Sequence, residues 1–212
     1  MAEKATITAV RKALEHSPKR NFKQTVDLSI NLKDVDLSIP KNRIQEDIIL
    51  PHGRGKPIKV CVICSGEMLL KAKDVADRVV SVEELGTIAD DRKQAKKMAN
   101  EFEYFIAEAP LMPTIGKRLG IVLGPRGKMP KPIPPGADPK SMIDNLRKSV
   151  SIRSRDKMTF HTAVGTTDMT PEDIADNIEL IVKRLSLKFE KGTMNIRSAY
   201  VKTTMGPSEK VI

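Results

Sequence analysis

The spacing of apolar and polar residues changes twice along the chain. From Phe22 to Lys33, apolar side chains alternate with polar ones, which is typical of an antiparallel strand with one buried and one wet face. Residues 58–64, IKVCVIC, instead form a continuous apolar run, which favours a strand buried on both faces. Alternation returns in residues 158–167, MTFHTAVGTT. The pattern therefore predicts antiparallel structure near both ends and α/β structure between them.

Helical spacing predicts further elements between these strands. Ile7, Val10 and Leu14 recur at helical intervals and predict a helix over residues 6–16. Thr170 suits an N-cap, followed by Pro171 at the first helical position of a long amphipathic helix. Other helices are predicted over 67–75, 90–102 and 141–148, and other strands near 45–50, 78–82, 104–107 and 195–204. The stretch 110–136 is so rich in proline and glycine that we expect it to be mostly loop.

The order of these elements predicts an α+β protein with two domains. An antiparallel α+β domain is expected from both chain ends, residues 1–66 and 157–212. An α/β, Rossmann-like domain, residues 67–156, is expected to be inserted into it.

Composition narrows the class of partner. The net charge is +10, from 37 Lys and Arg against 27 Asp and Glu, which favours a polyanionic partner. Residues 110–155 alone carry ten basic and two acidic residues. No apolar run approaches the roughly 20 residues of a membrane helix, and the first residues lack the apolar stretch of a signal peptide. Two cysteines cannot form a disulfide framework, so we expect a reducing, cytoplasmic location.

The most unusual basic string is LGPRGKMPKP, residues 123–132. Its glycines and cations suit contact with phosphate. It is not a Walker A loop, because Val122 stands where a glycine is needed and Met129 follows the lysine. The following prolines also argue against the helix that a KH-type GXXG clamp requires. The residues alone leave phosphate contact and a plain exposed loop equally open.

Two further segments could either contact RNA or have a purely structural role. TTMGP, residues 203–207, could meet a ribose edge through hydroxyls, a flexible Met and a Gly, but the residues alone favour an ordinary exit from a strand, with Gly and Pro ending it. Phe22 follows a Lys-Arg pair and could stack on a base. Its parity matches Val26 and Leu28, so the pattern alone predicts that it lies in the core.

Catalytic and metal chemistry finds little support. Cys61 and Cys64 would point to opposite faces of one strand and are expected to be buried thiols. His16, His52 and His161 have no ligand spacing. No nucleophile–base or paired-carboxylate pattern stands out. We therefore expect no enzyme, no metal site and no cofactor.

Several strings together resemble the ribosomal protein L-one family, the stalk protein of the large ribosomal subunit. They run in order along nearly the whole chain: NFKQTVDL at 21–28, LPHGRGK at 50–56, LGPRGKMPKP at 123–132, FHTAVG at 160–165, ADNI at 175–178 and RSAYVKTTMGP at 197–207. The short N-terminal part and the many lysines resemble the archaeal form.

The resemblance implies a structural protein that binds large-subunit rRNA directly, at the mobile stalk near the tRNA exit site. It further implies involvement in release of deacylated tRNA, with possible direct contact, and repression of translation by binding the protein's own mRNA. The RNA-binding residues implied are Phe22, Lys23, Thr25, Ser198, Thr204, Met205 and Gly206. An auxiliary RNA-contact loop is implied at Gly124, Arg126, Gly127 and Lys128.

Two alternatives remain beside this interpretation. A non-ribosomal RNA-binding module would bind RNA without preferring the stalk rRNA. An α/β enzyme acting on a phosphate ligand through residues 124–131 would bind nucleotides saturably, but its phosphate-loop pattern is incomplete.

Overall fold

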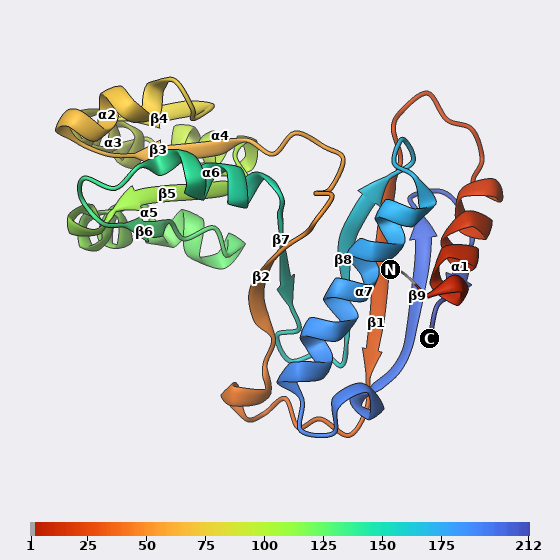
Figure 1. The fold of residues 1–212 in the computed structure, drawn as a ribbon. Coiled ribbons are helices and arrows are strands. Elements are labelled where there is room, and N and C mark those ends of the chain that lie inside the picture. The colour runs from red at the N-terminus through yellow and green to blue at the C-terminus, as the bar shows by residue number, and fades with distance from the viewer. Residues whose placement is uncertain (1–2) are drawn as a thin grey trace. The chain divides into compact units, whose positions relative to one another are not determined.

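The structure is a computed structural model that describes residues 3–212, apart from the side chain of Glu67. The chain divides into two compact units. The terminal unit consists of the residues up to Lys56 together with Lys148–Ile212. The inserted unit is Pro57–Arg147. Figure 1 shows both units.

The terminal unit contains a four-stranded antiparallel sheet in the order β10-β9-β1-β8. Its strands are β1 (Thr25–Leu32), β8 (Thr159–Thr166), β9 (Ile196–Thr203) and β10 (Ser208–Lys210). Burial alternates strictly along β1, where Val26, Leu28 and Ile30 are fully buried. The alternation predicted from the sequence is therefore confirmed for this strand.

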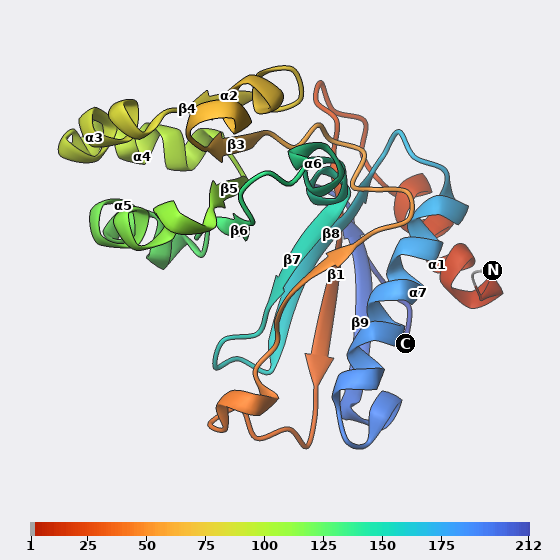
Figure 2. The ribbon, with the colours of Figure 1, turned by 60° about the vertical axis from the view of Figure 1, so that its left-hand side comes forward.

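Two helices cover the apolar face of this sheet. They are α1 (Lys4–Glu15), which contacts β9, and α7 (Pro171–Lys188), which contacts β8; Figures 1 and 2 show α7 running along the sheet. Helix α7 begins as predicted, because the Thr170 hydroxyl accepts a hydrogen bond from the backbone N–H of Asp173 at 3.2 Å. A second, two-stranded sheet pairs β2 (Gln45–Ile49) with β7 (Ser149–Arg153). Its apolar residues join the same core.

The inserted unit is a parallel four-stranded sheet in the order β4-β3-β5-β6. The strands are β3 (Val60–Ile63), β4 (Arg78–Val80), β5 (Tyr104–Glu108) and β6 (Lys131–Ile133). The helices are α2 (Gly66–Lys73), α3 (Val82–Asp90), α4 (Arg92–Glu101), α5 (Met112–Arg126) and α6 (Pro139–Arg147). All four residues of β3 are buried, as the continuous apolar run predicts.

Separate apolar clusters lie on the two faces of this sheet. Residues from α2 and α6 form one cluster with Val60, Val62 and Cys64. Residues from α3, α4 and α5 form the other with Cys61 and Ile63. The two cysteines thus lie on opposite faces, as predicted. Burial raises the pKa of the Cys61 thiol to about 12 and that of Cys64 to about 11, so both are thiols at neutral pH.

The predicted boundaries at 66/67 and 156/157 differ from the observed division. The predicted division places residues 60–63 in the terminal unit, but β3 is a central strand of the inserted sheet. It also places residues 149–153 in the inserted unit, but β7 pairs with β2 in the terminal unit. Strand partners decide which unit a segment belongs to, and the local pattern does not identify those partners. The mixed α/β content with several sheets is confirmed.

The expectation that residues 110–136 are mostly loop is wrong, because α5 spans Met112–Arg126. Pro113 stands in its first turn, where a missing N–H does no harm. Ile115, Leu119 and Leu123 form a buried stripe, while added Cβ atoms at the glycines of this helix would meet open space. Within residues 3–212, no helix has the length and apolarity to cross a membrane. No group of three metal-ligating side chains is found in the same described part.

Candidate nucleic-acid interface

The start of β1 and the exit of β9 lie side by side at one end of the terminal sheet. The backbone N–H of Thr204 donates to the carbonyl of Thr25 at 3.0 Å. The Thr204 hydroxyl oxygen accepts from the N–H of Thr25 at 3.1 Å and lies 3.2 Å from the Thr25 carbonyl oxygen. The Thr204 side chain thus extends the pairing of β1 and β9 beyond the last residue of the sheet, and it remains exposed.

The turn after Thr204 presents its side chains to solvent. Met205 is 51% exposed, a large fraction for a residue whose apolar surface would normally be buried. A Cβ placed on Gly206 would lie 2.3 Å from the hydroxyl oxygen of Thr203, so a side chain at this position would have to displace it. Thr203 is fully buried, and its hydroxyl lies 2.9 Å from that of Ser17. The turn therefore packs closely against the buried Thr203, whose hydroxyl is bonded to Ser17.

Gln24 belongs to this site although the sequence pattern does not predict a role for it. Its side-chain oxygen accepts from the N–H of Met205 at 3.0 Å. Its amide nitrogen donates to the Ser17 hydroxyl at 3.0 Å and to the Pro18 carbonyl at 2.7 Å. Gln24 is only 4% exposed, yet it holds the exposed turn in place. The signal was a polar residue at an apolar position of the alternation, between Phe22 and Val26.

Phe22 and Lys23 precede the strand. Phe22 is 53% exposed and lies outside β1, which begins at Thr25. The prediction from parity that Phe22 lies in the core is therefore wrong, because the alternation does not extend beyond the hydrogen-bonded strand. Lys23 Nζ lies 2.6 Å from Asp168 Oδ2, and the hydrogen bond to Asp168 raises the pKa of this lysine. Lys23 nevertheless remains exposed, just before the start of β1.

The loop 50–56 adds a further cation. Lys56 Nζ donates to the Thr25 hydroxyl at 2.7 Å. The fully buried side chain of Asn177, on α7, holds this loop through hydrogen bonds. Its amide nitrogen donates to the carbonyls of Gly53 and Val164, both at 2.9 Å. The resemblance included both strings, but only the structure connects Asn177 to the loop.

Asp27 lies one step further along the wet face of β1. It is opposite Lys202 on β9. Burial raises the pKa of Asp27, while the charges of His161, Lys202, Lys56 and Arg54 partly oppose that rise. A cluster of cationic side chains thus surrounds one carboxylate beside the Thr25–Thr204 pair.

Ser198 is not part of this group. It is opposite Asn31 in the strand register and accepts from the Asn31 amide nitrogen at 2.8 Å. Asn31 is six residues from Thr25 on β1, a separation of about 20 Å at the rise of a strand. Ser198 is also only 9% exposed. The structure therefore brings together the other six predicted residues and leaves Ser198 at the far end of the sheet.

The predicted auxiliary loop is not a loop. Gly124 and Arg126 lie in the last turn of α5, and Gly127 ends that helix with a φ of 66°. Arg126 donates to the carbonyl of Val122 at 3.0 Å. Lys128 Nζ donates to the carbonyls of Ala99 and Phe102 at 2.9 and 2.8 Å, and burial lowers its pKa. Both cations therefore donate hydrogen bonds within the inserted unit.

Comparison with known proteins identifies the family. Residues 13–207 match the sequence model of the ribosomal protein L1p/L10e family. The chain belongs to this family. It is 57% identical over the whole of both chains to "Large ribosomal subunit protein uL1" of Methanocella arvoryzae. Proteins with the same description in Picrophilus torridus and Haloferax volcanii are 52% and 50% identical, over at least 94% of each chain.

The family settles the broad class of this protein. It is a structural ribosomal protein of the large subunit and not an enzyme, so the phosphate-ligand enzyme is excluded. The resemblance found in the sequence, including its archaeal character, is confirmed.

Proposed function

We propose that the terminal unit binds large-subunit rRNA directly through a terminal-strand site. This site is defined as Phe22, Lys23, Thr25, Lys56, Thr204, Met205 and Gly206. The observation that carries the proposal is the exposed turn at Thr204–Gly206, which is bonded to Thr25 and to the buried Gln24. A surface held this rigidly loses little conformational entropy when it binds.

The chemistry of the site suits a folded RNA more than a bare phosphate backbone. Threonine hydroxyls and backbone groups can bond ribose 2′-hydroxyls and phosphates. The exposed apolar surfaces of Met205 and Phe22 can pack against sugars or unstacked bases. Lys23 and Lys56 contribute charge at the edge of this surface, so that salt affects affinity while the shape of the turn determines the preference for one RNA.

Two finer roles belong to the same proposal. A regulatory site on the protein's own mRNA would be bound by the same residues if it presents the same folded shape, which would make the protein a translational repressor. On the ribosome, the protein would lie at the mobile stalk near the tRNA exit site and take part in release of deacylated tRNA. Ser198 and the α5 end at Gly124–Lys128 would contribute less, because Ser198 is only 9% exposed and the Lys128 ammonium is partly buried against two carbonyls of its own unit.

The test is a comparison of two RNAs and three variants. Affinity is measured for a stalk-rRNA fragment and for an unrelated structured RNA of equal length, each at low and physiological salt. Thr204→Ala should weaken binding of the stalk fragment by about 1–3 kcal/mol if the hydroxyl bond is buried in the complex. Thr204→Ser, which keeps the hydroxyl, should restore most of that loss. Thr8→Ala, at an exposed position on α1, is the matched control and should bind as the unchanged protein does.

The outcome distinguishes specific recognition of the stalk fragment from non-specific electrostatic binding of any RNA. A large preference for the stalk fragment that persists at physiological salt, and that Thr204→Ala removes, supports the site. Equal binding of both RNAs, with both fading together as salt rises, would mean that the charge of +10 accounts for all binding. The assignment of the terminal-strand site would then be abandoned.

A further inference from the structure

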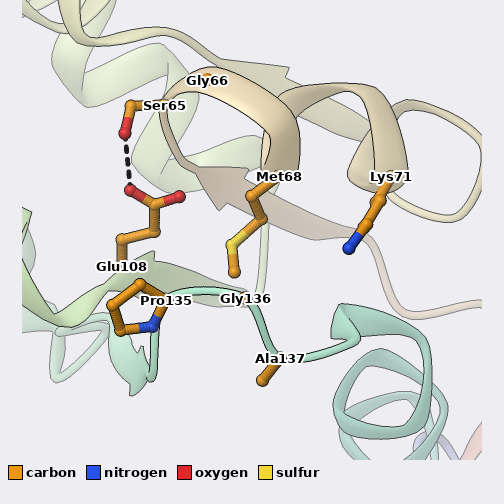
Figure 3. Close-up of a pocket in the computed structure, with 8 residues that line it drawn as sticks. All are labelled: Ser65, Gly66, Met68, Lys71, Glu108, Pro135, Gly136 and Ala137. Atoms are coloured by element: carbon orange, nitrogen blue, oxygen red, sulfur yellow. Dashed lines mark hydrogen bonds between the residues drawn. The ribbon is translucent and has the colours of Figure 1, made fainter.

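A cavity of about 270 Å³ lies in the inserted unit, at the carboxyl ends of β3 and β5 (Figure 3). The chain runs from β3 to β4 on one side and then returns to β5 on the other side of β3. The crevice between β3 and β5 is therefore the topological switch point of the sheet. Open α/β sheets bind their ligands at such points. Nothing in the terminal-strand site involves this cavity.

The cavity has one buried charged group in its wall. Glu108 is the last residue of β5 and is only 7% exposed. The Ser65 hydroxyl donates to its Oε2 at 2.7 Å. Figure 3 shows the other carboxylate oxygen directed toward the side of the cavity where Met68 lies. A buried carboxylate oxygen is stabilised by a hydrogen-bond donor, so the cavity suits a ligand that brings one.

Donors stand beside this acceptor. Helix α2 starts at Gly66, directly after Ser65, and no described side chain caps its first amides. The Ser65 hydroxyl, which could have done so, is instead bonded to Glu108. Added Cβ atoms at Gly66 and Gly136 would meet nothing within 4 Å, so the backbone is open on both sides of the cavity. The site thus presents an acceptor next to backbone donors.

We propose that this cavity binds a guanine ring. The Watson–Crick edge of guanine carries two adjacent N–H donors beside the O6 acceptor. The donors match the Glu108 carboxylate and O6 matches the first amides of α2, whereas adenine would turn a ring nitrogen lone pair toward the carboxylate. Met68 and Pro135 supply apolar surface for the ring, and Lys71 at the edge suits an attached phosphate. The guanine comes either from a free nucleotide or from an unpaired residue of RNA.

The test uses the full chain and several defined ligands. Binding of guanosine 5′-monophosphate, inosine 5′-monophosphate and adenosine 5′-monophosphate is followed by NMR, through the amide signals of Ser65, Gly66 and Gly136. The guanine nucleotide should bind about tenfold or more tightly than the adenine nucleotide, since it alone offers paired donors to a charged acceptor. The inosine nucleotide, which lacks the 2-amino group, should lie between them. Short single-stranded RNAs with one central guanine or adenine identify the source.

Variants locate the ligand. Glu108→Gln should abolish the guanine preference, whereas Glu83→Gln, an exposed glutamate on α3 of the same unit, should leave it unchanged. Ser65→Ala should weaken it less, because the carboxylate stays. Equal binding of guanine and adenine ligands, no binding of either in both the nucleotide and RNA experiments, or an unchanged preference in Glu108→Gln would each overturn the proposal. The RNA experiment rests on the proposed function, but the nucleotide experiment does not. Failure at Glu108 would also leave the effect of Thr204→Ala on the stalk fragment untouched.

Discussion

Replacement of Gln24 by leucine tests whether a buried amide holds the exposed turn Thr204–Gly206 of the proposed RNA-binding site. The change keeps the size of the side chain and removes three hydrogen bonds, to Ser17, Pro18 and Met205. Each such bond contributes about 0.5–1.5 kcal/mol net. Some of the separated groups regain water, so we expect the terminal unit to lose about 2–3 kcal/mol of unfolding free energy. For a chain of this size, this loss lowers Tm by about 4–12 °C.

Two measurements check this expectation together. Calorimetry gives the shift in Tm, and hydrogen exchange reports on the Met205 amide, whose partner is Gln24 Oε1. That amide should exchange faster in Gln24→Leu, and affinity for the stalk fragment should fall because the turn is no longer fixed before binding. Gln94→Leu, at an exposed position on α4, is the control for the change of chemistry. An unchanged exchange rate at Met205, with a Tm within about 1 °C of the original, would refute the reasoning.

Three further predictions follow from one buried and two partly buried polar groups. Asn177→Leu should lower the unfolding free energy of the terminal unit by about 2–4 kcal/mol in urea denaturation, because two hydrogen bonds to the backbone of loop 50–56 and one to the carbonyl of Val164 are lost; an unchanged urea midpoint would contradict this. Asp27→Asn should remove a pH dependence: burial raises the folded pKa of Asp27 above 3.8, so this residue makes the protein less stable as pH rises through the window above 3.8. The variant should gain stability relative to the parent at neutral pH, and equal stability of the two across that window would count against it. Lys128→Met should lower the stability of the inserted unit by about 1–3 kcal/mol, since two carbonyls lose their cationic donor. Its affinity for the stalk fragment should stay within about twofold, and a large loss of affinity without a change in stability would restore the role of this residue as an RNA contact.

Local patterns were sufficient wherever neighbouring residues alone determine the element. The alternation of β1 predicted its buried face, and the hydroxyl of Thr170 predicted the start of α7. Helix α5 was missed because its glycines and prolines suggested a loop. The prolines lie in its first and last turns and the glycines face open space, while its buried residues still recur at helical spacing. The domain boundaries depended on which strands pair, as β7 with β2, and pairing between distant segments leaves no local signature.

In the candidate site too, the sequence predicted individual residues but not the contacts between distant segments that hold them. Single residues such as Thr204 and Met205 could be assigned from the resemblance, but the reason for their position could not. Gln24, Lys56 and Asn177 hold this surface through bonds to segments far away in the sequence. For Gln24 the only sequence signal was a polar residue at an apolar position, and for Lys56 and Asn177 it was their place in strings that resemble the family. The group was found only once the backbone brought the start of β1 and the exit of β9 together.

Two strings show why charge alone misleads about RNA contact. LGPRGKMPKP carries the denser charge, yet its Lys128 ammonium is fixed by two carbonyls of its own unit. Moving it to a phosphate would break those bonds, which offsets what the new contact contributes. TTMGP carries no charge at all, but Met205 is half exposed while its backbone is already fixed. Binding there gains new contacts and loses few old ones. The useful criterion for an RNA-binding residue in this chain is therefore an exposed side chain on a fixed backbone, and the uncharged turn meets it better than the basic string.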